Sequence, residues 1–399
     1  MDTRADESAS ASSVSGRQWV GLAVLAVCVA LFVAASARWQ HQFDLRIYHG
    51  AVRSWAHGGD LYAYRQPETV RVFGFTYPPF AAIAMLPMTI VAWPVAAVAL
   101  AMTSVSGTLL LLWRRFHRWA PTLAGGILLA AAEPWRDTLS LGQINLVLLT
   151  LVAVDLLYLV GRHPAAGILI GVAAGIKLTP AVFIAYLLLA RRYRAGFIAA
   201  GTALATVGLG WLIAPGASRA YWTSLVWRTG RVGEIFSVPN QSLDGALTRM
   251  HAPAAVWPAL VVVILAVWAY RVRRAAAAAA DDAWAGLALT GVAVCLISPI
   301  SWVHHLVWQI PALLVLVDRR ADRRHRYWYL LLGAGIYGLM ATRVLWLFKD
   351  PANPLYLPGA NMHVITGLVL LLTVPVKSAP RPTTVLPAPA TRPSLAETA

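Results

Sequence analysis

The sequence predicts an all-α polytopic membrane protein. Of its 399 residues, 59% are hydrophobic and 13% are charged, and the mean hydropathy of +0.63 lies far above that of a soluble domain. Apolar runs of helical length recur along the chain and alternate with clusters of arginine. We therefore expect about twelve transmembrane or re-entrant helices, which form a single membrane domain over residues 18–376.

The first apolar run, Trp19–Ala37, is long enough to cross about 30 Å of hydrocarbon as a helix. Its end, Ala35-Ser36-Ala37, also resembles a signal-peptidase site, but the apolar part of a signal peptide usually has only about 7 to 15 residues. We expect an uncleaved anchor that holds the next segment, FDLRIYHGA at 43–51, against the membrane surface. Residues 1–17 and 377–399 are rich in small residues and proline, which predicts two disordered cytoplasmic tails.

The arginine clusters predict the topology. Further apolar runs lie near 79–113, 119–134, 143–160, 164–176, 178–190, 196–214, 254–271, 283–299, 303–317, 328–347 and 362–376. Basic clusters fall between them, at 114–118, 162, 191–194, 271–274 and 319–326. If the N-terminus is cytoplasmic, every cluster falls on the cytoplasmic side, as the positive-inside tendency requires. The polar loops then face outward.

Two parts of this topology allow more than one interpretation. The run 79–113 contains Pro87 and Pro94, so it forms either one kinked helix or three shorter pieces. The runs 164–176 and 178–190 are each only about 20 Å long as helices. We interpret GIKLTP at 175–180 as the tip of a short hairpin that dips toward a cavity, because Lys177 at the centre of one span would cost about 2.5 to 3.5 kcal/mol.

The expected outer loops contain most of the unusual polar residues, including many arginines, which suggests an anionic ligand such as a lipid phosphate. Simple contact with anionic head groups is the alternative. Asp44 is the best-placed candidate for a general base, because it directly follows the end of the anchor. A positioned base contributes a factor of about 10² to 10⁴ to a reaction that deprotonates a hydroxyl. The alternative is an interfacial aspartate that pairs with Arg46 or caps a helix.

Three further motifs supply candidates for substrate binding. Tyr77 lies in TYPPF, where the two prolines also fit a simple turn into a helix. EPWRDTLSLGQIN at 133–145 contains Arg136, Gln143 and Asn145. The amides of Gln143 and Asn145 either bind sugar hydroxyls or tie helix ends together, and Gly142 permits close backbone approach. SVPNQSLDGAL at 237–247 contains Asn240 and Gln241, which suit a polyhydroxylated ligand or a plain loop cap.

The sequence indicates neither a metal site nor a cofactor. His304 and His305 are adjacent in SPISWVHHLVW, so they point to different faces of a helix and would need a third ligand to share a metal ion. Contact of one of them with a phosphate or a sugar is favoured. Cys28 and Cys295 lie in apolar runs and predict no disulfide framework. No Walker motif, dinucleotide fingerprint or soluble nucleotide-sugar domain is visible, so an activated donor has to arrive in the membrane.

The motifs FDLRIYHGA, TYPPF, EPWRDTLSLGQIN, GIKLTPAVF, NQSL and SPISWVHH occur in an order that resembles glycosyltransferase family 87, bacterial enzymes of the GT-C fold. The resemblance covers residues 43–310. It implies an α-1,2-mannosyltransferase of the cytoplasmic membrane that acts at the outer face. Its donor would be polyprenyl-phosphate-mannose, and its acceptor a mannose-bearing lipid or glycan such as a phosphatidylinositol mannoside or lipomannan.

By position, the resemblance implies that Asp44 is the general base and that Lys177, His304 and His305 lie near the donor phosphate or the acceptor. Relatives often have aspartate in place of Val303, so a second carboxylate at that point is not expected here. Lys177 and outer arginines would hold the charge of the leaving phosphate. Tyr48 and Arg46 would position Asp44 or the acceptor.

Two alternatives stay open at this stage. A transferase that uses another polyprenyl-linked sugar, such as arabinose, would need a similar aspartate and fold. A transporter or lipid flippase would be expected to show paired internal repeats, and we see none in the sequence. We expect a lipid bilayer around the protein and no nucleic-acid partner. Most of the 17 tryptophans fit an interfacial aromatic belt, although stacking on sugars also suits this residue.

Overall fold

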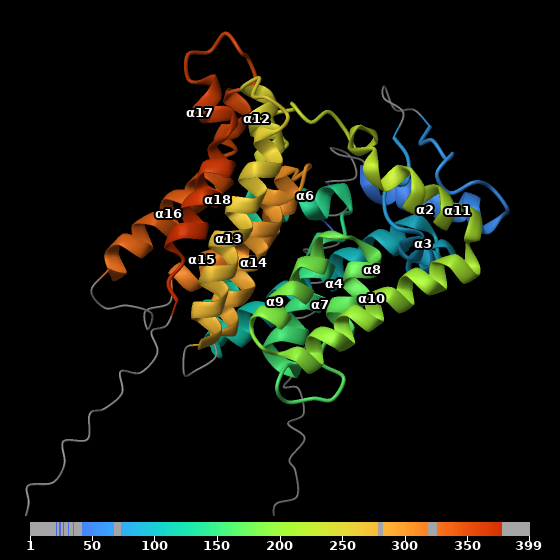
Figure 1. The fold of residues 1–399 in the computed structure, drawn as a ribbon, viewed down its shortest axis with the longest axis horizontal. Coiled ribbons are helices and arrows are strands. Elements are labelled where there is room, and N and C mark those ends of the chain that lie inside the picture. Colours follow the sequence, from blue (N-terminus) through green and yellow to red (C-terminus); the bar gives the residue numbers. More distant parts are fainter. Residues whose placement is uncertain are drawn as a thin grey trace, which may run out of the picture.

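The computed structural model describes residues 42–67, 73–277, 282–317 and 325–376, together with five isolated residues between 21 and 35. The predicted anchor Trp19–Ala37 therefore lies almost wholly outside the described residues, and both predicted tails lie entirely outside them. The described chain folds into helices, which supports the all-α class, and its sheet-type pairing is an isolated β-bridge between Asn240 and Trp302 (Figure 1).

The first half of the described chain contains ten α-helices. These are α2 (Phe43–Ala56), α3 (Pro79–Met85), α4 (Trp93–Phe116), α5 (Trp119–Ala131), α6 (Glu133–Leu141), α7 (Asn145–Val154), α8 (Ile168–Ile176), α9 (Val182–Leu189), α10 (Tyr193–Ile213) and α11 (Pro215–Thr223). Several of them are connected by short 3₁₀ helices, η1 (Leu86–Thr89), η3 (Thr179–Ala181), η4 (Leu225–Trp227) and η5 (Thr229–Arg231), or by a π-helical turn, η2 (Asp155–Leu159).

The second half follows the same pattern. It contains α12 (Leu243–Arg249), α13 (Val256–Ala277), α14 (Ala283–Ile297), η6 (Val303–Gln309), α15 (Ile310–Leu316), α16 (Arg326–Thr342), η7 (Val344–Leu347), α17 (Tyr356–Ala360) and α18 (Met362–Thr373). The helices of the two halves share one extended apolar core, in which α13, α14, α15 and α18 pack together.

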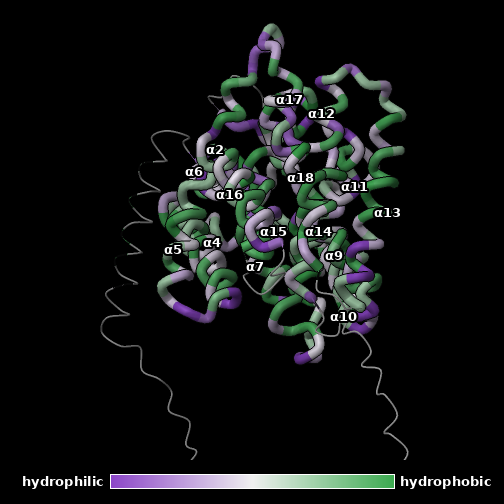
Figure 2. Tube along the Cα trace, turned by 90° about the vertical axis from the view of Figure 1, so that its left-hand side faces the viewer, coloured by the Kyte–Doolittle hydropathy of each residue, from purple (hydrophilic) through white to green (hydrophobic). Residues whose placement is uncertain are grey.

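Three helices in the described part, α4, α10 and α13, are long and apolar enough to cross a membrane, and α6 with the α7–η2 helix forms a further apolar pair bent by 114°. Shorter apolar helices account for several of the other predicted runs, among them 119–134 and 283–299. Figure 2 shows hydrophilic chain at the connections beyond the ends of α4, α5 and α10. The protein is therefore a multi-pass membrane protein, although several runs form helices too short to span alone.

The run 79–113 forms three pieces rather than one kinked helix. They are α3, η1 and α4, and the breaks coincide with the two prolines. Pro87 lies inside η1, while Pro94 occupies the first turn of α4, where its missing N–H leaves no carbonyl unpaired.

The predicted hairpin around Lys177 is confirmed. Gly167 lies against Ala195 and Gly175 against Thr206, so α8 runs parallel to α10. A Cβ on Gly167, whose φ is +105°, would lie 2.2 Å from the carbonyl oxygen of Ala195, and only glycine permits that approach. Gly196 packs on Leu188, so α9 returns antiparallel to α10. Lys177 therefore lies at the turn between two antiparallel helices.

Several arginines of the basic clusters cap helix ends at the opposite end of this hairpin. Arg114 donates to the carbonyl of Leu157, Arg115 to that of Leu314, and Arg271 to that of Leu371, at 2.6 to 3.4 Å. These carbonyls lie near helix C-termini, where a cation pairs the last acceptors and opposes the helix dipole. One end of the bundle is therefore basic, and the turn at Lys177 points away from it.

Candidate active site

A cavity of about 450 Å³ lies at the end of the bundle that contains the Lys177 turn. Its wall combines α2, the loop before α3, the corner between α6 and α7, the α8–α9 turn, the segment 229–237 and the segment 298–305. The predicted site residues that line it are Asp44, Tyr48, Tyr77, Gln143, Lys177, His304 and His305. Segments separated by more than 250 positions thus meet at one polar chamber.

Asp44 lies at one end of a chain of hydrogen-bonded side chains. Gln143 makes a side-chain hydrogen bond to Asp44, and its Oε1 accepts a bond of 3.0 Å from the Tyr77 hydroxyl. The Tyr48 hydroxyl lies 2.8 Å from that of Tyr77. Since Oε1 of Gln143 already accepts, its NH₂ group is left to donate to the Asp44 carboxylate. The chain holds the carboxylate at a fixed place in the cavity wall.

Gly142 explains how the α6–α7 corner comes close enough to α2 for this contact. Its φ of +70° ends α6 in the left-handed conformation that glycine adopts without strain. A Cβ at this position would lie 2.5 Å from Cβ of Leu45. The sequence predicted close backbone approach here, and the neighbour that approaches is the helix that contains Asp44.

Partial burial raises the pKa of the Asp44 carboxyl to about 6, because removal of water penalises the charged form. The hydrogen bond from Gln143 and the positive charge of Lys177 act in the opposite direction and keep the rise from being larger. A carboxylate with a pKa near neutrality is ionised at pH 7 and still basic enough to accept a proton from a hydroxyl in the transition state.

Lys177 lies deeper in the cavity and is 9% exposed. Its Nζ donates to Oδ1 of Asn145 at 2.8 Å and lies 3.2 Å from Nε2 of His305. The ring of Tyr77 faces the same ammonium, with its centroid 5.2 Å away. Burial lowers the pKa of the Lys177 ammonium to about 7, and the negative charge of Asp44 opposes this shift. When protonated, Lys177 is a cation in a site largely shielded from water, where a negative charge is stabilised more strongly than at the surface.

Both histidines face the cavity. Their rings lie edge to face with centroids 4.7 Å apart. His304 is buried, and its Nε2 has no hydrogen-bond partner within the described part of the chain. A buried, unpaired ring nitrogen at a cavity wall is suited to a ligand hydroxyl or phosphate oxygen. Over the described ranges, no group of three or more histidine, cysteine or acidic side chains is placed to hold a metal ion.

Two predicted site residues do not reach the cavity. Arg46 is exposed, and its guanidinium carbon lies 4.6 Å from the centroid of the Trp93 ring. Because Arg46 is two residues after Asp44 on the same helix, its side chain points to the opposite face. Arg136 donates to the carbonyl of Ala131 at 3.3 Å on the outer side of α6. Neither side chain lines the cavity, and a role of either in substrate binding stays a prediction.

Three predicted amides are structural. Asn145 lies behind the cavity wall, where it holds Lys177 and donates to the carbonyl of His304 at 3.4 Å. Asn240 donates to the carbonyls of Ile235 and Pro299. Gln241 donates to Val238 and Ala360 and accepts from the N–H of His363. The alternative in which these amides tie segments together describes the structure, because each is buried with its polar atoms already paired.

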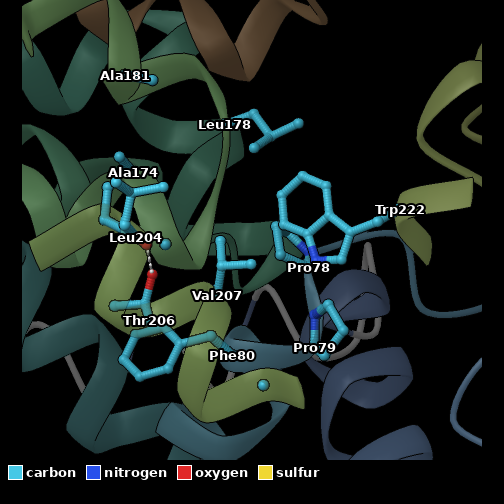
Figure 3. Close-up of a pocket in the computed structure, with 13 residues that line it drawn as sticks. Pro78, Pro79, Phe80, Ala174, Leu178, Ala181, Leu204, Thr206, Val207 and Trp222 are labelled. Atoms are coloured by element: carbon cyan, nitrogen blue, oxygen red, sulfur yellow. Dashed lines mark hydrogen bonds between the residues drawn. The ribbon is translucent and has the colours of Figure 1, made fainter. Parts of the chain in front are cut away.

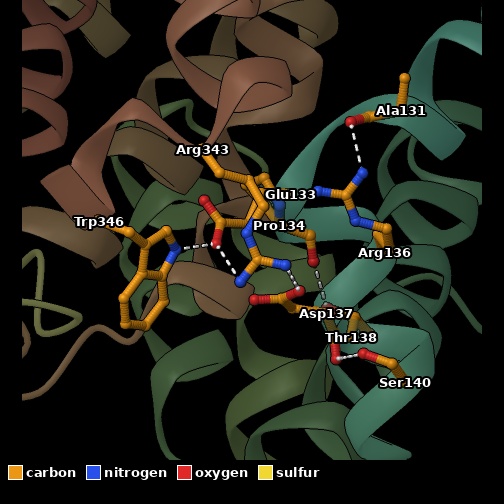
Figure 4. A network of polar contacts seen from close by, with 9 residues as sticks. All are labelled: Ala131, Glu133, Pro134, Arg136, Asp137, Thr138, Ser140, Arg343 and Trp346. Carbon is orange, nitrogen blue, oxygen red and sulfur yellow. Dashed lines mark hydrogen bonds and ion pairs between the residues drawn. The ribbon is translucent and has the colours of Figure 1, made fainter. Parts of the chain in front are cut away.

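A cluster of polar contacts that the sequence did not suggest clamps α6 from its far side (Figure 4). Arg343, at the end of α16, forms ion pairs with Glu133 at 2.9 Å and Asp137 at 3.6 Å, and Trp346 donates to Glu133. On the opposite side, Thr138 donates to the carbonyl of His304 at 3.1 Å. The clamp therefore fixes the helix on which both Gln143 and His304 depend.

A family comparison decides between the classes of protein that this geometry allows. The model of glycosyltransferase family 87 matches residues 75–299. The chain belongs to glycosyltransferase family 87. This family 87 member is a glycosyltransferase, and the membership agrees with the GT-C class that the motifs implied.

Curated relatives of the family member are mycobacterial. The chain is 35% identical over 82% of its length to a polyprenol-phosphate-mannose-dependent α-(1-2)-phosphatidylinositol pentamannoside mannosyltransferase of Mycobacterium tuberculosis, of which it covers 80%. It is 34% identical over 82% of its length to the enzyme of the same name from Mycolicibacterium smegmatis, with 83% of that protein covered. It is also 32% identical to a polyprenol-phosphate-mannose-dependent α-(1-2)-phosphatidylinositol mannoside mannosyltransferase from that organism, over 81% and 78% of the two chains.

A comparison with solved structures finds ArnT from Cupriavidus metallidurans bound to undecaprenyl phosphate, with a TM-score of 0.39 and 17% identity, over 90% of this chain and 77% of that one.

The Tyr77 hydroxyl provides a first test of the hydrogen-bonded chain. We expect Tyr77→Phe to lower the rate of transfer by about 2- to 12-fold, since a neutral hydrogen bond contributes about 0.5 to 1.5 kcal/mol. It should also raise the pH below which the rate falls, because Gln143 would be held less firmly against Asp44 and its hydrogen bond lowers the pKa of that carboxyl. Tyr64→Phe is the control, since its hydroxyl bonds Gln66 away from the cavity. An unshifted pH profile would contradict the positioning role.

Proposed function

We propose that this family 87 member transfers mannose from polyprenyl-phosphate-mannose to a phosphatidylinositol mannoside, in α-1,2 linkage and with inversion at the anomeric carbon. The donor and acceptor follow the names of its relatives. The observation that carries the proposal is the shared cavity, in which the hydrogen-bonded Asp44 carboxylate and the buried Lys177 ammonium face one chamber. Such a pair can accept a proton from one substrate and stabilise the phosphate of the other.

In the proposed reaction, an acceptor hydroxyl attacks the anomeric carbon of a β-linked mannosyl phosphate from the opposite face. The new C–O bond forms as the bond to the phosphate oxygen breaks, through an oxocarbenium-like state that gives the α product. Asp44 takes the hydroxyl proton, and polyprenyl phosphate leaves with the bonding electron pair. Lys177 would stabilise the charge of the departing phosphate, with its ammonium held by Oδ1 of Asn145 and Nε2 of His305, so no separate acid is needed to protonate the leaving group.

An apolar pocket beside the cavity supports a lipid-linked donor (Figure 3). It has a volume of about 110 Å³ and shares Pro78 and Leu178 with the cavity. Its other wall comes from α10, where Leu204 and Val207 contribute, and Leu204 is 71% exposed on the outside of the bundle. A polyprenyl chain in this pocket would place its phosphate at Lys177, which precedes Leu178 in sequence.

The positive-inside tendency supports the proposed orientation. The end of the bundle that contains the capping arginines Arg114, Arg115 and Arg271 would face the cytoplasm, with both termini. The cavity would then open at the outer face of a bacterial cytoplasmic membrane.

The deciding experiment measures transfer by the purified protein from radiolabelled polyprenyl-phosphate-mannose to a phosphatidylinositol mannoside in detergent or nanodiscs. A parallel reaction uses polyprenyl-phosphate-arabinose. We expect an α-1,2-linked product with mannose and none with arabinose. Product with arabinose only would favour the other transferase, and no product from folded protein with either donor would overturn the proposal. A lipid-flipping assay would then test the transporter alternative.

The pH dependence of this reaction follows from the state of Asp44. The base acts only when ionised, and the pKa of this carboxyl is raised to about 6. The kcat/KM should therefore fall about tenfold per pH unit below pH 6. It should also fall above about pH 7, because burial lowers the pKa of the Lys177 ammonium to about 7 and the site loses its cation as that group deprotonates. A profile that stays flat down to pH 4.5, with the protein still folded, would exclude Asp44 as the base.

A further inference from the structure

One wall of the cavity has no role in the chemistry described so far. It consists of the segment 229–237, before α12, and the start of the segment 298–305. Two side chains that suit a sugar, Glu234 and Trp302, line the cavity there, and both are partly exposed. Lys177 and His304, by contrast, are only 9% and 8% exposed. Glu234 and Trp302 therefore lie at the rim, and the phosphate-binding groups lie at depth.

Buried contacts hold the two rim segments together. Asn240 forms a β-bridge with Trp302, and its Oδ1 accepts from the N–H of Ser301 at 2.8 Å. The N–H of Gln241 donates to the carbonyl of Ser301 at 2.7 Å. The amides that the sequence suggested as sugar ligands thus fix the backbone on both sides of the rim.

Arg231 fixes the other end of the rim. Its guanidinium donates to the carbonyls of Phe75 and Thr76 at 2.9 and 2.8 Å and lies over the rings of Tyr62 and Tyr221 at 5.7 Å. It therefore ties the segment with Glu234 to the loop that contains Tyr77. A binding wall that is fixed before the ligand arrives loses less entropy on binding.

Gly233 brings the backbone close to the indole of Trp302. A Cβ at this position would lie 2.5 Å from the Trp302 ring, and the φ of +149° is one that other residues rarely adopt. The next residue is Glu234, so the carboxylate follows directly after the contact with the indole. An aromatic ring and a carboxylate that line the same cavity match a pyranose ring, whose C–H face packs on the indole while its hydroxyls donate to the carboxylate.

We propose that Trp302 and Glu234 form a subsite for the hexopyranose ring of the acceptor that bears the attacking hydroxyl. This assignment rests on the proposed function. The donor mannose has to lie next to its phosphate, which the buried Lys177 holds, whereas the acceptor enters from the rim and reaches Asp44 last. Rim groups with sugar-binding chemistry therefore select the acceptor.

The test compares steady-state kinetics of Trp302→Ala and Glu234→Gln with those of the unmodified protein. We expect the KM for phosphatidylinositol mannoside to rise about tenfold or more in each variant, as when a central aromatic anchor or a charged hydrogen-bond partner is removed. The KM for polyprenyl-phosphate-mannose should change less than twofold. Trp227→Ala is the matched control, because Trp227 is 78% exposed and lies outside the cavity lining.

The outcomes separate this inference from the proposed function. Transfer by the unmodified protein with unchanged acceptor KM in both rim variants would overturn the subsite, while the function would stand. A rise in donor KM instead would place the donor sugar at the rim and likewise overturn it. Trp302→Phe, which keeps an aromatic face, should recover most of the acceptor affinity, and its failure to do so in a folded protein would also count against stacking.

Discussion

Asp44→Asn should lower the rate of mannosyl transfer by about 10²- to 10⁴-fold, the usual contribution of a positioned general base. Asparagine has nearly the same shape and can still pair with Gln143, but it cannot accept the hydroxyl proton. Because burial raises the pKa of Asp44, the neutral amide should not destabilise the fold. The loss should therefore appear in kcat, with donor affinity and thermal unfolding nearly unchanged.

Asp60→Asn is the control for this substitution. Asp60 lies on the connection that follows α2 and is exposed, and its Oδ1 accepts from the N–H groups of Tyr62 and Ala63, which an asparagine oxygen can also do. We expect unmodified activity in this control. If Asp44→Asn turns over at the unmodified rate, the base lies elsewhere and the half-buried carboxylate is structural.

The sequence predicted the fold class and the parts of the site whose position follows from local chemistry. Asp44 follows the end of an apolar run, and Lys177 interrupts one, so both have to lie where the membrane domain meets water or a cavity. The hairpin at Lys177 could be predicted because the flanking arginines fix the side of the membrane at which it begins and ends. Each of these arguments depends on the free-energy cost of a charge in hydrocarbon, so the position of a charged residue relative to an apolar run is enough to make the prediction.

Two physical reasons explain why the structure places some of the predicted site residues away from the cavity. Arg46 lies over Trp93 rather than beside Asp44, and its closeness to Asp44 in sequence says nothing about the direction of its side chain until the helical phase of α2 is known. For Asn240 and Gln241 both interpretations stayed open, because the sequence alone does not distinguish an amide that ties two segments together from one that binds a sugar. Only the distant partners, such as Ala360 for Gln241, distinguish these roles.

Long-range pairing also explains why the clamp on α6 was missed. Arg343 and Glu133 are separated by 210 positions, and neither belongs to a motif that indicates its partner. Their effect on the site is indirect, since α6 positions Gln143 and contacts the His304 carbonyl through Thr138. A single sequence predicts the groups that carry chemistry more readily than the groups that hold them in place.

Lys177→Met should lower transfer by about 10²- to 10³-fold, the loss found when one preorganised group that stabilises transition-state charge is removed. Methionine preserves volume but leaves Oδ1 of Asn145 without its 2.8 Å partner, at a cost of about 1 to 3 kcal/mol in stability, so thermal unfolding has to be measured alongside. The affinity for polyprenyl phosphate distinguishes a loss of phosphate binding from a loss of stability. If Lys177 served only the fold, its replacement would leave that affinity unchanged in protein that remains folded. Lys177→Arg retains the charge with a different shape and should recover part of the activity. Lys349→Met is the control, because Lys349 is exposed and lies over the ring of Trp346, and it should behave as the unmodified protein. If Lys177→Met binds polyprenyl phosphate as tightly as the unmodified protein does, the donor phosphate is held by another cation.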